Sequence, residues 1–472
     1  MNILISRPIE PFLHPQKKNP VLKQTIKSIL SNRIPGQIVI QITDRCNARC
    51  PQCGMRATET FTRSTLDTAA IRKTIDSAAR QGVQAISFTG GEPLLDVPRL
   101  IELINHAGDA GIPFIRTGTN GFPFRHPEKK GFKSRVSKLA DELAATPLRN
   151  FWISLDSAVD SVHEQMRGFP GVVAGIAKAL PLFHRAGIYP AVNLGINRNV
   201  GGAATRNLYR SAVGSDAAYL EIFYNRYRKA FARFYRRVID LGFTTANTCY
   251  PMSIDLAEKS QGLSAVYAAT TVDDIVRFSP LEKQMLFKAL KATIRQYRSK
   301  IRIFSPLCSL EALIRQYANS DPAHTTYGCR GGVDFFFINA ADGHAYPCGY
   351  RGNENFGRPQ ELEIHQVKPP KENLACRECD WECFRDPSEM LGPLLEIVSS
   401  PLGFARRVAA RPQSLSTWVR DLSYYRACEF FDGRRPPNYR KLRRFTATSE
   451  DDRPRGRERC QLEEFNQKLS FP

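Results

Sequence analysis

The sequence predicts an α/β fold, a partial (β/α)6 barrel of the TIM type followed by a small cysteine-rich α+β domain. Six short runs rich in β-branched or aromatic residues alternate with segments of helical period. This alternation favours parallel strands in an open or partial barrel over a sandwich. Two of the runs end in chemically distinctive loops, and ligands of such barrels bind at the carboxyl ends of the strands.

The elements are expected in a regular order along the chain. Strands are expected at residues 37–43, 84–89, 113–117, 150–155, 188–195 and 243–248, and helices at 67–81, 98–110, 135–145 and 172–186. A chain of 472 residues is longer than one core usually supports. We therefore expect a leader segment (1–35), the barrel core (36–300), a cysteine-rich domain (301–395) and a basic, partly disordered C-terminal appendage (396–472).

Three cysteines, Cys46, Cys50 and Cys53, are spaced C-x3-C-x2-C directly after the first expected strand. Cysteine is the usual ligand of iron–sulfur clusters. Three thiolates leave one iron of a four-iron cluster open for a ligand that is not protein. A zinc site completed by a distant fourth ligand uses similar short loops, so the spacing alone does not decide between zinc and a cluster.

The second expected strand ends in Gly90-Gly91-Glu92-Pro93. Two glycines let a backbone come close to a ligand, and the Glu92 carboxylate can accept hydrogen bonds from an amino group. At this point the sequence resembles the radical S-adenosylmethionine (radical SAM) superfamily. Its signatures are a C-x3-C-x2-C loop after the first strand and a GGE motif after the second.

This resemblance implies a cofactor and an activity. The loop cysteines Cys46, Cys50 and Cys53 would hold a [4Fe–4S] cluster, the amino and carboxylate groups of SAM would chelate its fourth iron, and Gly90, Gly91, Glu92 and Pro93 would border the methionyl end of SAM. The family often has an aromatic residue before the third cysteine, near the adenine, whereas this chain has Gln52. The implied activity is reductive cleavage of SAM to a 5′-deoxyadenosyl radical that removes hydrogen from a substrate. A flavodoxin or ferredoxin would donate the electron.

Two further strand ends carry candidate site residues. Residues 117–121 and 153–156 resemble the TNG and SLD…H…RG segments of peptide-modifying radical SAM enzymes, with His163 and Arg167-Gly168 completing the second segment. By this resemblance Asn120, Ser154 and Asp156 would line the SAM or substrate pocket. The plain alternatives are a turn at TNG and an ordinary hydroxyl at the strand end. No side chain is singled out as catalytic.

A second group of cysteines follows the core. Cys329, Gly343 and Cys348 form a C-x13-G-x4-C pattern around an expected strand (333–338), and a C-x2-C-x3-C run follows. This half resembles the SPASM or shorter twitch extension, although a full extension has C-x2-C-x5-C-x3-C. The resemblance implies one auxiliary [4Fe–4S] cluster with ligands drawn from Cys329, Cys348, Cys376, Cys379 and Cys383. Cys308 or Cys428 would join a second, incomplete cluster. A zinc ribbon is the alternative, and Cys249 and Cys460 are expected to be free thiols.

The chain is strongly basic, with 67 Lys and Arg against 46 Asp and Glu and a net charge of +21. Residues 224–239 interleave basic and aromatic side chains, and residues 441–459 are typical of a mobile tail. Such a surface attracts RNA, anionic membranes or acidic peptides. More often it is a solvated face over a packed aromatic stripe.

Several features favour a soluble, cytoplasmic enzyme. The N-terminus lacks the order of a signal peptide because Arg7, Pro8 and Pro11 interrupt it. No apolar run reaches about 18 residues, the length of a membrane span. The cysteines should therefore stay reduced. The predicted substrate is a peptide or protein side chain. The alternatives are RNA modification and, from a different class, a noncatalytic zinc protein that binds nucleic acid.

Overall fold

The computed structural model describes residues 28–34, 36–53, 62–251, 274–318, 327–367, 376 and 379–447. Within these residues one open nine-stranded sheet has the order β7-β6-β5-β4-β3-β2-β1-β8-β9, and only the β8–β9 pair is antiparallel. The strands are β1 (Gln37–Thr43), β2 (Ala85–Gly90), β3 (Phe114–Thr119), β4 (Leu148–Ser154), β5 (Ala191–Gly195), β6 (Thr245–Cys249), β7 (Arg302–Ile303), β8 (Phe335–Ile338) and β9 (Ala345–Tyr346). The predicted α/β fold with a partial barrel is confirmed.

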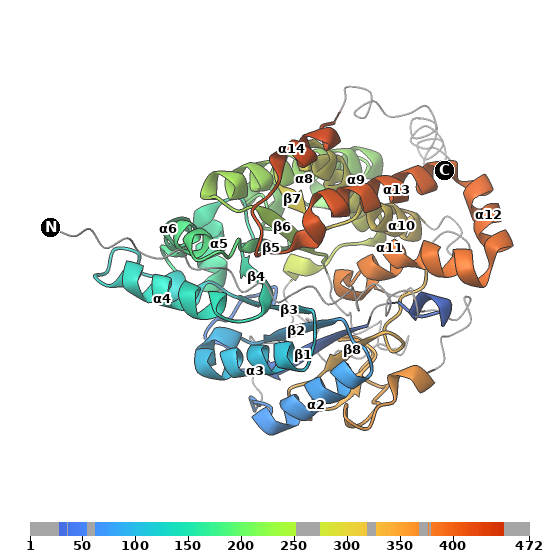
Figure 1. Cartoon of the computed structure of the whole chain (residues 1–472). Coiled ribbons are helices and arrows are strands. Elements are labelled where there is room, and N and C mark those ends of the chain that lie inside the picture. Colours follow the sequence, from blue (N-terminus) through green and yellow to red (C-terminus); the bar gives the residue numbers. More distant parts are fainter. Residues whose placement is uncertain are drawn as a thin grey trace.

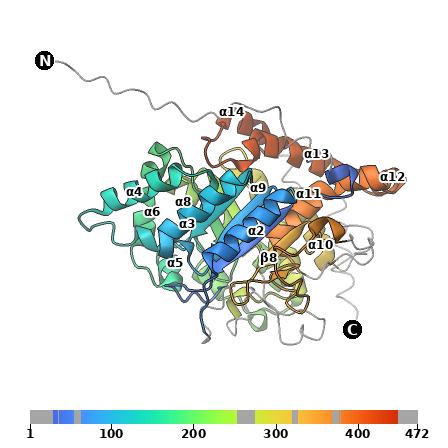
Figure 2. The same ribbon diagram turned by 60° about the horizontal axis from the view of Figure 1, so that its bottom comes forward.

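Helices surround this sheet (Figure 1). They are α2 (Thr68–Arg80), α3 (Val97–Asp109), α4 (Phe132–Ala144), α5 (Asp160–Arg167), α6 (Val172–Arg185), α7 (Ala203–Arg206), α8 (Asp216–Leu241), α9 (Pro280–Tyr297), α10 (Leu307–Tyr317), α11 (Glu382–Ser399), α12 (Pro401–Ala410), α13 (Pro412–Ala427) and α14 (Tyr439–Leu442). Figure 2 shows α2 and α3, which connect the first three strands, lying side by side. The predicted helices α2, α3, α4 and α6 are all present.

The first strand is the centre of the core. All seven residues of β1 are buried, because β2 and β8 flank it on either side. A parallel strand covered on both faces is mostly apolar, which is why the limits of β1 were predictable. The neighbouring helix α3 buries Leu100, Leu103 and Ile104 against the sheet and begins at Asp96, whose side chain accepts the Arg99 N–H. The sequence therefore defines both the strand and its covering helix.

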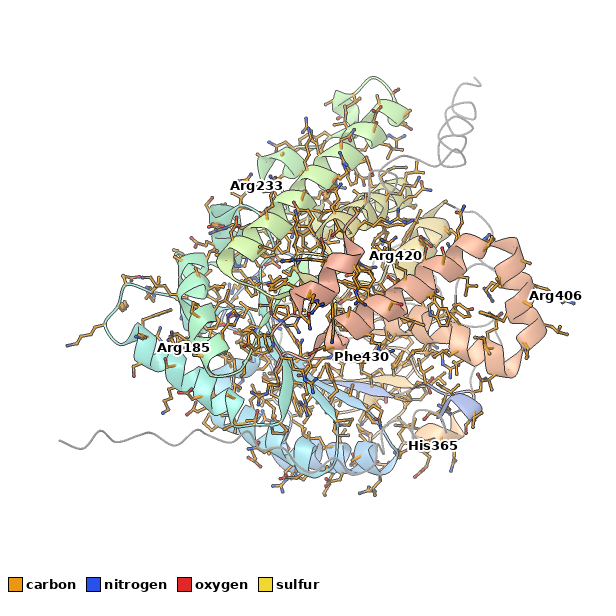
Figure 3. All side chains as sticks on the ribbon, turned by 45° about the horizontal axis from the view of Figure 1, so that its top comes forward. Arg185, Arg233, His365, Arg406, Arg420 and Phe430 are labelled. Carbon is orange, nitrogen blue, oxygen red and sulfur yellow. The ribbon has the colours of Figure 1, made fainter. Side chains whose placement is uncertain are left out.

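The aromatic stripe of α8 packs into the core. Tyr227, Phe231 and Phe234 are buried, and Arg233 on the same helix is exposed. Figure 3 shows Arg185, Arg233 and Arg406 on the outside of their helices. A solvated basic face over a packed aromatic stripe accounts for this part of the positive charge.

The C-terminal segment belongs to the fold as far as residue 447. The Tyr424 hydroxyl is buried and accepts the Ile303 N–H at 2.8 Å, so α13 is joined to β7. The Gly433 N–H donates to the Arg149 carbonyl at 2.8 Å, and its own carbonyl accepts the Tyr189 N–H at 2.7 Å. Residues 401–447 thus cover the amino ends of β4 and β5. The predicted tail at 441–459 begins inside this segment, where α14 and a 3-10 turn (Arg443–Phe445) form, and its remainder lies outside the described residues.

The cysteine-rich segment joins the same sheet. Strand β8 pairs with β1 in parallel register, Gln37 opposite Phe335 and Ile40 opposite Ile338. The predicted hairpin, β8 and β9 around the turn at Gly343, therefore extends the barrel sheet beyond β1. The predicted domain limits stay a prediction. No helix within the described residues has the length and apolar character to span a membrane.

Candidate active site

A cavity of about 290 Å³ lies inside the curve of the sheet. Every core residue that the sequence predicted as a ligand contributes to its wall. These residues are Cys46, Cys50, Cys53, Gly90, Gly91, Glu92, Pro93, Asn120, Ser154 and Asp156. They come from the carboxyl ends of β1 to β4, as expected for a parallel barrel. Their roles toward a cofactor stay predictions, but the fold brings all of them together.

The cysteine loop directly follows β1. The Cys53 N–H donates to the Cys50 carbonyl at 3.1 Å, and the Ala48 N–H donates to Cys46 Sγ at 3.4 Å. Burial raises the pKa of Cys46 and raises that of Cys50 to about 12. A thiol must lose its proton before it can bind a metal. Three free thiols that reach one cavity fit the three-cysteine ligand set of a [4Fe–4S] cluster.

The two glycines of the GGE motif fit against this loop. A Cβ on Gly90 would lie 2.2 Å from the Thr43 carbonyl oxygen, and one on Gly91 would lie 2.0 Å from that of Arg45. The Gly91 N–H donates to the Thr43 carbonyl at 2.8 Å. We expected the missing side chains to admit a ligand. The structure shows that they also admit the backbone of the cysteine loop, so that β2 positions this loop.

Glu92 links the ends of β2 and β3. One carboxylate oxygen accepts the Leu94 N–H at 3.0 Å and so caps the 3-10 turn Pro93–Asp96, and the other accepts the Asn120 N–H at 2.6 Å. Burial raises the pKa of Glu92 to about 7, although these hydrogen bonds act in the opposite direction. The Asn120 side chain donates to Asn47 Oδ1 at 2.8 Å and contacts Cys46 Sγ at 3.6 Å. Asn120 therefore braces the cysteine loop.

Asp156 is the centre of a buried polar network at the end of β4. Its Oδ2 accepts Gln52 Nε2 at 2.8 Å and Arg167 Nε at 2.6 Å, and its N–H donates to His163 Nδ1 at 3.1 Å. Burial opposes ionisation of Asp156, but Arg167 and His163 outweigh it and hold the pKa of this carboxyl well below its usual range. Ser154 also lines the cavity, and its hydroxyl makes no hydrogen bond to any residue that the structure describes.

Sequence reasoning missed Arg167 as a site residue, although it noted the RG pair. The Arg167 guanidinium lines the cavity, pairs with Asp156 and lies close enough to Cys50 to lower the pKa of that thiol in part. It also missed Gln52 as a partner of Asp156. The only available signal was the position of each residue beside a motif.

Four of the predicted auxiliary cysteines form a second group. The Cys329 N–H donates to the Cys376 carbonyl at 3.0 Å. Burial raises the pKa of Cys329 to about 11, that of Cys348 to about 12 and that of Cys379 well above the usual value. For each of these three thiols, the charge of neighbouring cysteines adds to the effect. Trp381 and Phe384 pack around the group.

The fifth cysteine, Cys383, lies toward the central cavity with Cys249 and Glu382. The Cys383 thiol donates to Glu382 Oε1 at 3.6 Å, and Cys249 donates to Asn193 Oδ1 at 3.3 Å. Cys308 contacts Met390 and also lines a separate small cavity, and Cys428 is buried beside Tyr424. Cys460 lies outside the described residues. In the described part of the chain, no three His, Cys, Asp or Glu side chains converge closely enough to hold a single metal ion.

An open parallel sheet that carries three free cysteines and a GGE turn at its carboxyl edge defines the class of a SAM-dependent iron–sulfur enzyme. Residues 40–197, which include the cysteine loop and β1 to β5, match the Radical SAM superfamily model. The chain carries a radical SAM domain and is a radical SAM enzyme. The predicted class, the SAM dependence and the iron–sulfur character are confirmed.

The chain is also similar to curated proteins. It is 22% identical over 323 residues to an AdoMet-dependent heme synthase of Methanosarcina barkeri, which covers 68% of this chain and 79% of that protein. It is 36% identical over 137 residues to a PqqA peptide cyclase of Xanthomonas campestris, which covers 29% of this chain and 32% of that protein. The match to the cyclase thus spans about a third of the length of each protein.

Two solved structures show a weaker similarity. Streptococcus suis SuiB bound to S-adenosylmethionine has a TM-score of 0.47, 14% identity and coverage of 74% of this chain and 70% of SuiB. Native anSMEcpe with bound AdoMet has a TM-score of 0.43, 13% identity and coverage of 82% of this chain and all of that chain.

Proposed function

We propose that this enzyme abstracts a hydrogen atom from a peptide or protein side chain. Convergence of the three loop cysteines and the GGE turn on one cavity carries the proposal. When bound, the [4Fe–4S] cluster and SAM supply the 5′-deoxyadenosyl radical that removes the hydrogen. The chain itself provides the ligands, the orientation and the exclusion of water.

Cys46, Cys50 and Cys53 would hold the cluster, and Gly90 to Pro93 would border the methionyl end of SAM. Asn120 braces the loop from β3 through its contact with Cys46. Asp156 and Ser154 at the end of β4 offer hydrogen-bond acceptors toward the rest of SAM. The neighbouring Arg167 places a positive charge beside the cluster loop.

The four cysteines Cys329, Cys348, Cys376 and Cys379 would hold one auxiliary [4Fe–4S] cluster. The mutual influence of these thiols supports this set over one that includes Cys383, because none of the four acts on the pKa of Cys383. Such a cluster would accept the electron of the product radical or bind the substrate. A flavodoxin or ferredoxin would supply the electron for SAM cleavage.

A peptide substrate is supported by the similarity to proteins named PqqA peptide cyclase. The relatives named AdoMet-dependent heme synthase match a longer part of the chain, so a non-peptide substrate is the second candidate. The alternative of RNA modification rests only on the positive net charge of the chain. The aromatic residues of α8 are buried in the core and so cannot stack on bases, which weakens this alternative. A noncatalytic zinc protein does not fit the radical SAM domain.

Anaerobic reconstitution followed by mass spectrometry tests the proposal. Reduced holoenzyme is incubated with SAM and with cell-extract peptides, small molecules and RNA in separate reactions. We expect 5′-deoxyadenosine in every reaction and a small mass change, such as the loss of two hydrogens, in the peptide fraction. A mass change confined to RNA or small molecules contradicts the peptide assignment. Absence of 5′-deoxyadenosine from fully reconstituted protein contradicts the proposed use of SAM.

A further inference from the structure

Polar side chains line part of the interior of the sheet, beside apolar ones such as Phe114 and Trp152. Alternate residues of a strand face the same side, and each of the strands β3 to β6 sends alternate residues into the cavity. These are Phe114, Arg116 and Gly118 from β3, Asn150, Trp152 and Ser154 from β4, Ala191, Asn193 and Gly195 from β5, and Thr245, Asn247 and Cys249 from β6. Closed barrels of this type are filled mainly by bulky branched side chains. Here the strands β3 to β6 contribute in addition one arginine, Arg116, and three amides, Asn150, Asn193 and Asn247.

Arg116 is the cation at the level below the predicted SAM residues. Its Nε donates to Ser87 Oγ, and both residues line the cavity. Among the residues that the structure describes, no carboxylate forms an ion pair with Arg116. Asn150 is opposite Arg116 in the strand register. The side-chain amide of Asn150 has no hydrogen-bond partner among the described residues. Arg116 is half-buried, and a guanidinium that is partly withdrawn from water favours an anionic partner.

Unpaired polar atoms continue along the same wall. Thr245 is 2% exposed and lines the cavity, yet its Oγ1 has no hydrogen-bond partner among the described residues. Asn247 Oδ1 lacks one as well, although its Nδ2 donates to Asn193 Oδ1 at 2.8 Å. Buried polar groups are normally paired. These atoms therefore point to a polar ligand inside the cavity.

The carboxylate of Glu382 shares the cavity but is engaged elsewhere. Its Oε2 accepts the Tyr250 N–H at 3.3 Å, and its Oε1 accepts the Cys383 thiol at 3.6 Å. Within the described residues Glu382 therefore forms no ion pair with Arg116, whose guanidinium donates to Ser87. An arginine fork matches a carboxylate in a bidentate geometry, and such charge-assisted pairs are strong in a cavity shielded from water.

We propose that Arg116 binds a carboxylate of the substrate, with Asn150, Asn193, Asn247 and Thr245 hydrogen bonding to polar groups beside it. The inference rests on the proposed function, because it places the substrate in the cavity that the predicted SAM residues line. The carboxylate belongs either to an acidic side chain of a peptide or to a small carboxylic acid. Both sources share the chemistry that Arg116 recognises.

Binding of matched probes to reconstituted, SAM-loaded holoenzyme tests this site by anaerobic calorimetry. The probes are glutarate, its diamide, a capped Ala-Glu-Ala peptide and its Ala-Gln-Ala counterpart. We expect wild-type enzyme to bind at least one acid more tightly than its amide. Arg116→Gln should abolish this preference by a loss of about 10- to 100-fold in affinity for the acid, and Arg116→Lys should retain part of it. A preference within the peptide pair identifies a side chain, and one within the glutarate pair identifies a small acid.

Arg185→Gln is the matched control, because it removes the same charge from the exposed end of α6. It should leave the preference unchanged. Equal binding of acids and amides by wild-type enzyme, or a preference that survives Arg116→Gln, overturns the proposal. So does a variant that keeps the preference but alters the cluster absorbance, because Arg116 would then be a counter-ion for cluster thiolates. Formation of 5′-deoxyadenosine by wild-type enzyme is measured in parallel and reports on the proposed function separately.

Discussion

Gln52 and Asp156 lie 104 residues apart in the sequence, yet Gln52 Nε2 donates to Asp156 Oδ2 at 2.8 Å. This bond joins the cysteine loop after β1 to the end of β4. The same carboxylate pairs with Arg167 at 2.6 Å, so one buried anion holds two elements of the cavity wall. The position at which relatives often carry an aromatic residue therefore holds the loop by a polar contact.

Removal of the Asp156 charge should destabilise the protein. Asp156→Asn leaves the Arg167 guanidinium without its partner, and breaking a buried pair in this way costs about 3–5 kcal/mol. Gln52→Ala removes one hydrogen bond and should cost about 1 kcal/mol. Urea unfolding of the reduced apoprotein measures both free energies. Equal losses in the free energy of unfolding for the two variants would show that Arg167 does not need Asp156 as its buried partner.

The cysteine loop should lose its cluster when one of its thiols is removed. Wild-type protein with two four-iron clusters should contain about eight irons per chain, and Cys50→Ala should contain about four and form no 5′-deoxyadenosine. Cys428→Ala is the control, because this thiol packs beside Tyr424 and Phe431 in the C-terminal segment. Iron analysis and chromatography of the nucleoside products provide the two measurements. Formation of 5′-deoxyadenosine by Cys50→Ala would refute the assignment of the first cluster.

Cys379 is expected to be a ligand of the auxiliary cluster, whereas Cys383 is not. Because Cys379 lies with Cys329, Cys348 and Cys376, Cys379→Ala should lower the iron content from about eight to about four. Cys383→Ala should keep about eight irons, because this thiol lies toward the central cavity. Iron analysis with Mössbauer or EPR spectroscopy distinguishes the clusters. The reverse result would place Cys383 in the ligand set.

Gly91 lies so close to the cysteine loop that no side chain should fit at this position. A Cβ at this position would lie 2.0 Å from the Arg45 carbonyl oxygen, so Gly91→Ala must displace the backbone of the cysteine loop. Overpacking of this kind costs about 1–3 kcal/mol, and the displaced loop should bind less iron. Gly214→Ala is the matched control, since a Cβ at that position meets no atom within 4 Å. Iron content equal to that of the control would show that the loop adapts.

Glu282 should make stability depend on pH in the acid range. It caps α9 with Ser279, pairs with Arg198 at 3.0 Å and accepts the Tyr219 hydroxyl at 2.6 Å. Burial opposes its ionisation, but these partners outweigh burial and lower the pKa of Glu282 below its usual 4.5. The unfolded chain therefore binds the proton more tightly than the folded chain does. The contribution of Glu282 to the free energy of unfolding is present in full above pH 4.5 and is lost as the pH falls below that value.

Glu282→Gln should cost about 2 kcal/mol at neutral pH and flatten the loss of stability between pH 5 and pH 3. Urea unfolding of the reduced apoprotein at several pH values measures both effects. Glu221→Gln on the exposed face of α8 is the control. Parallel pH profiles for wild-type protein and Glu282→Gln would show that another carboxylate carries the dependence.

The core strands and the two core motifs could be predicted from the sequence because their signals are local. Strand β1 is a mostly apolar run that the cysteine loop follows directly, and its predicted limits agree with the structure. β5 was predicted to begin at residue 188 but begins at Ala191, because Tyr189 bonds to Gly433 instead of to a neighbouring strand. That contact joins residues far apart in the chain, which no local pattern reveals.

The missed features depend on long-range contacts. Arg167 follows Asp156 by 11 residues, and only the path of α5 brings the two side chains together. Separation of Cys383 from the other auxiliary cysteines depends on the start of α11, which directs this residue to the cavity beside Cys249. Residues 401–447 are rich in charge and resemble a tail in composition, but the buried Tyr424 and the backbone of Gly433 attach them to the sheet.

The pairing of β8 with β1 has a consequence for how the molecule is made on the ribosome. Strand β1 emerges early, but β8, its neighbour on one side, follows after about 300 residues. The segment that covers β4 and β5 comes later still. Until then one side of β1 is an unpaired edge, which invites association with other chains. Nascent or truncated chains that stop before residue 335 should therefore aggregate unless a chaperone protects them. A minimal barrel without β8 would need a redesigned β1.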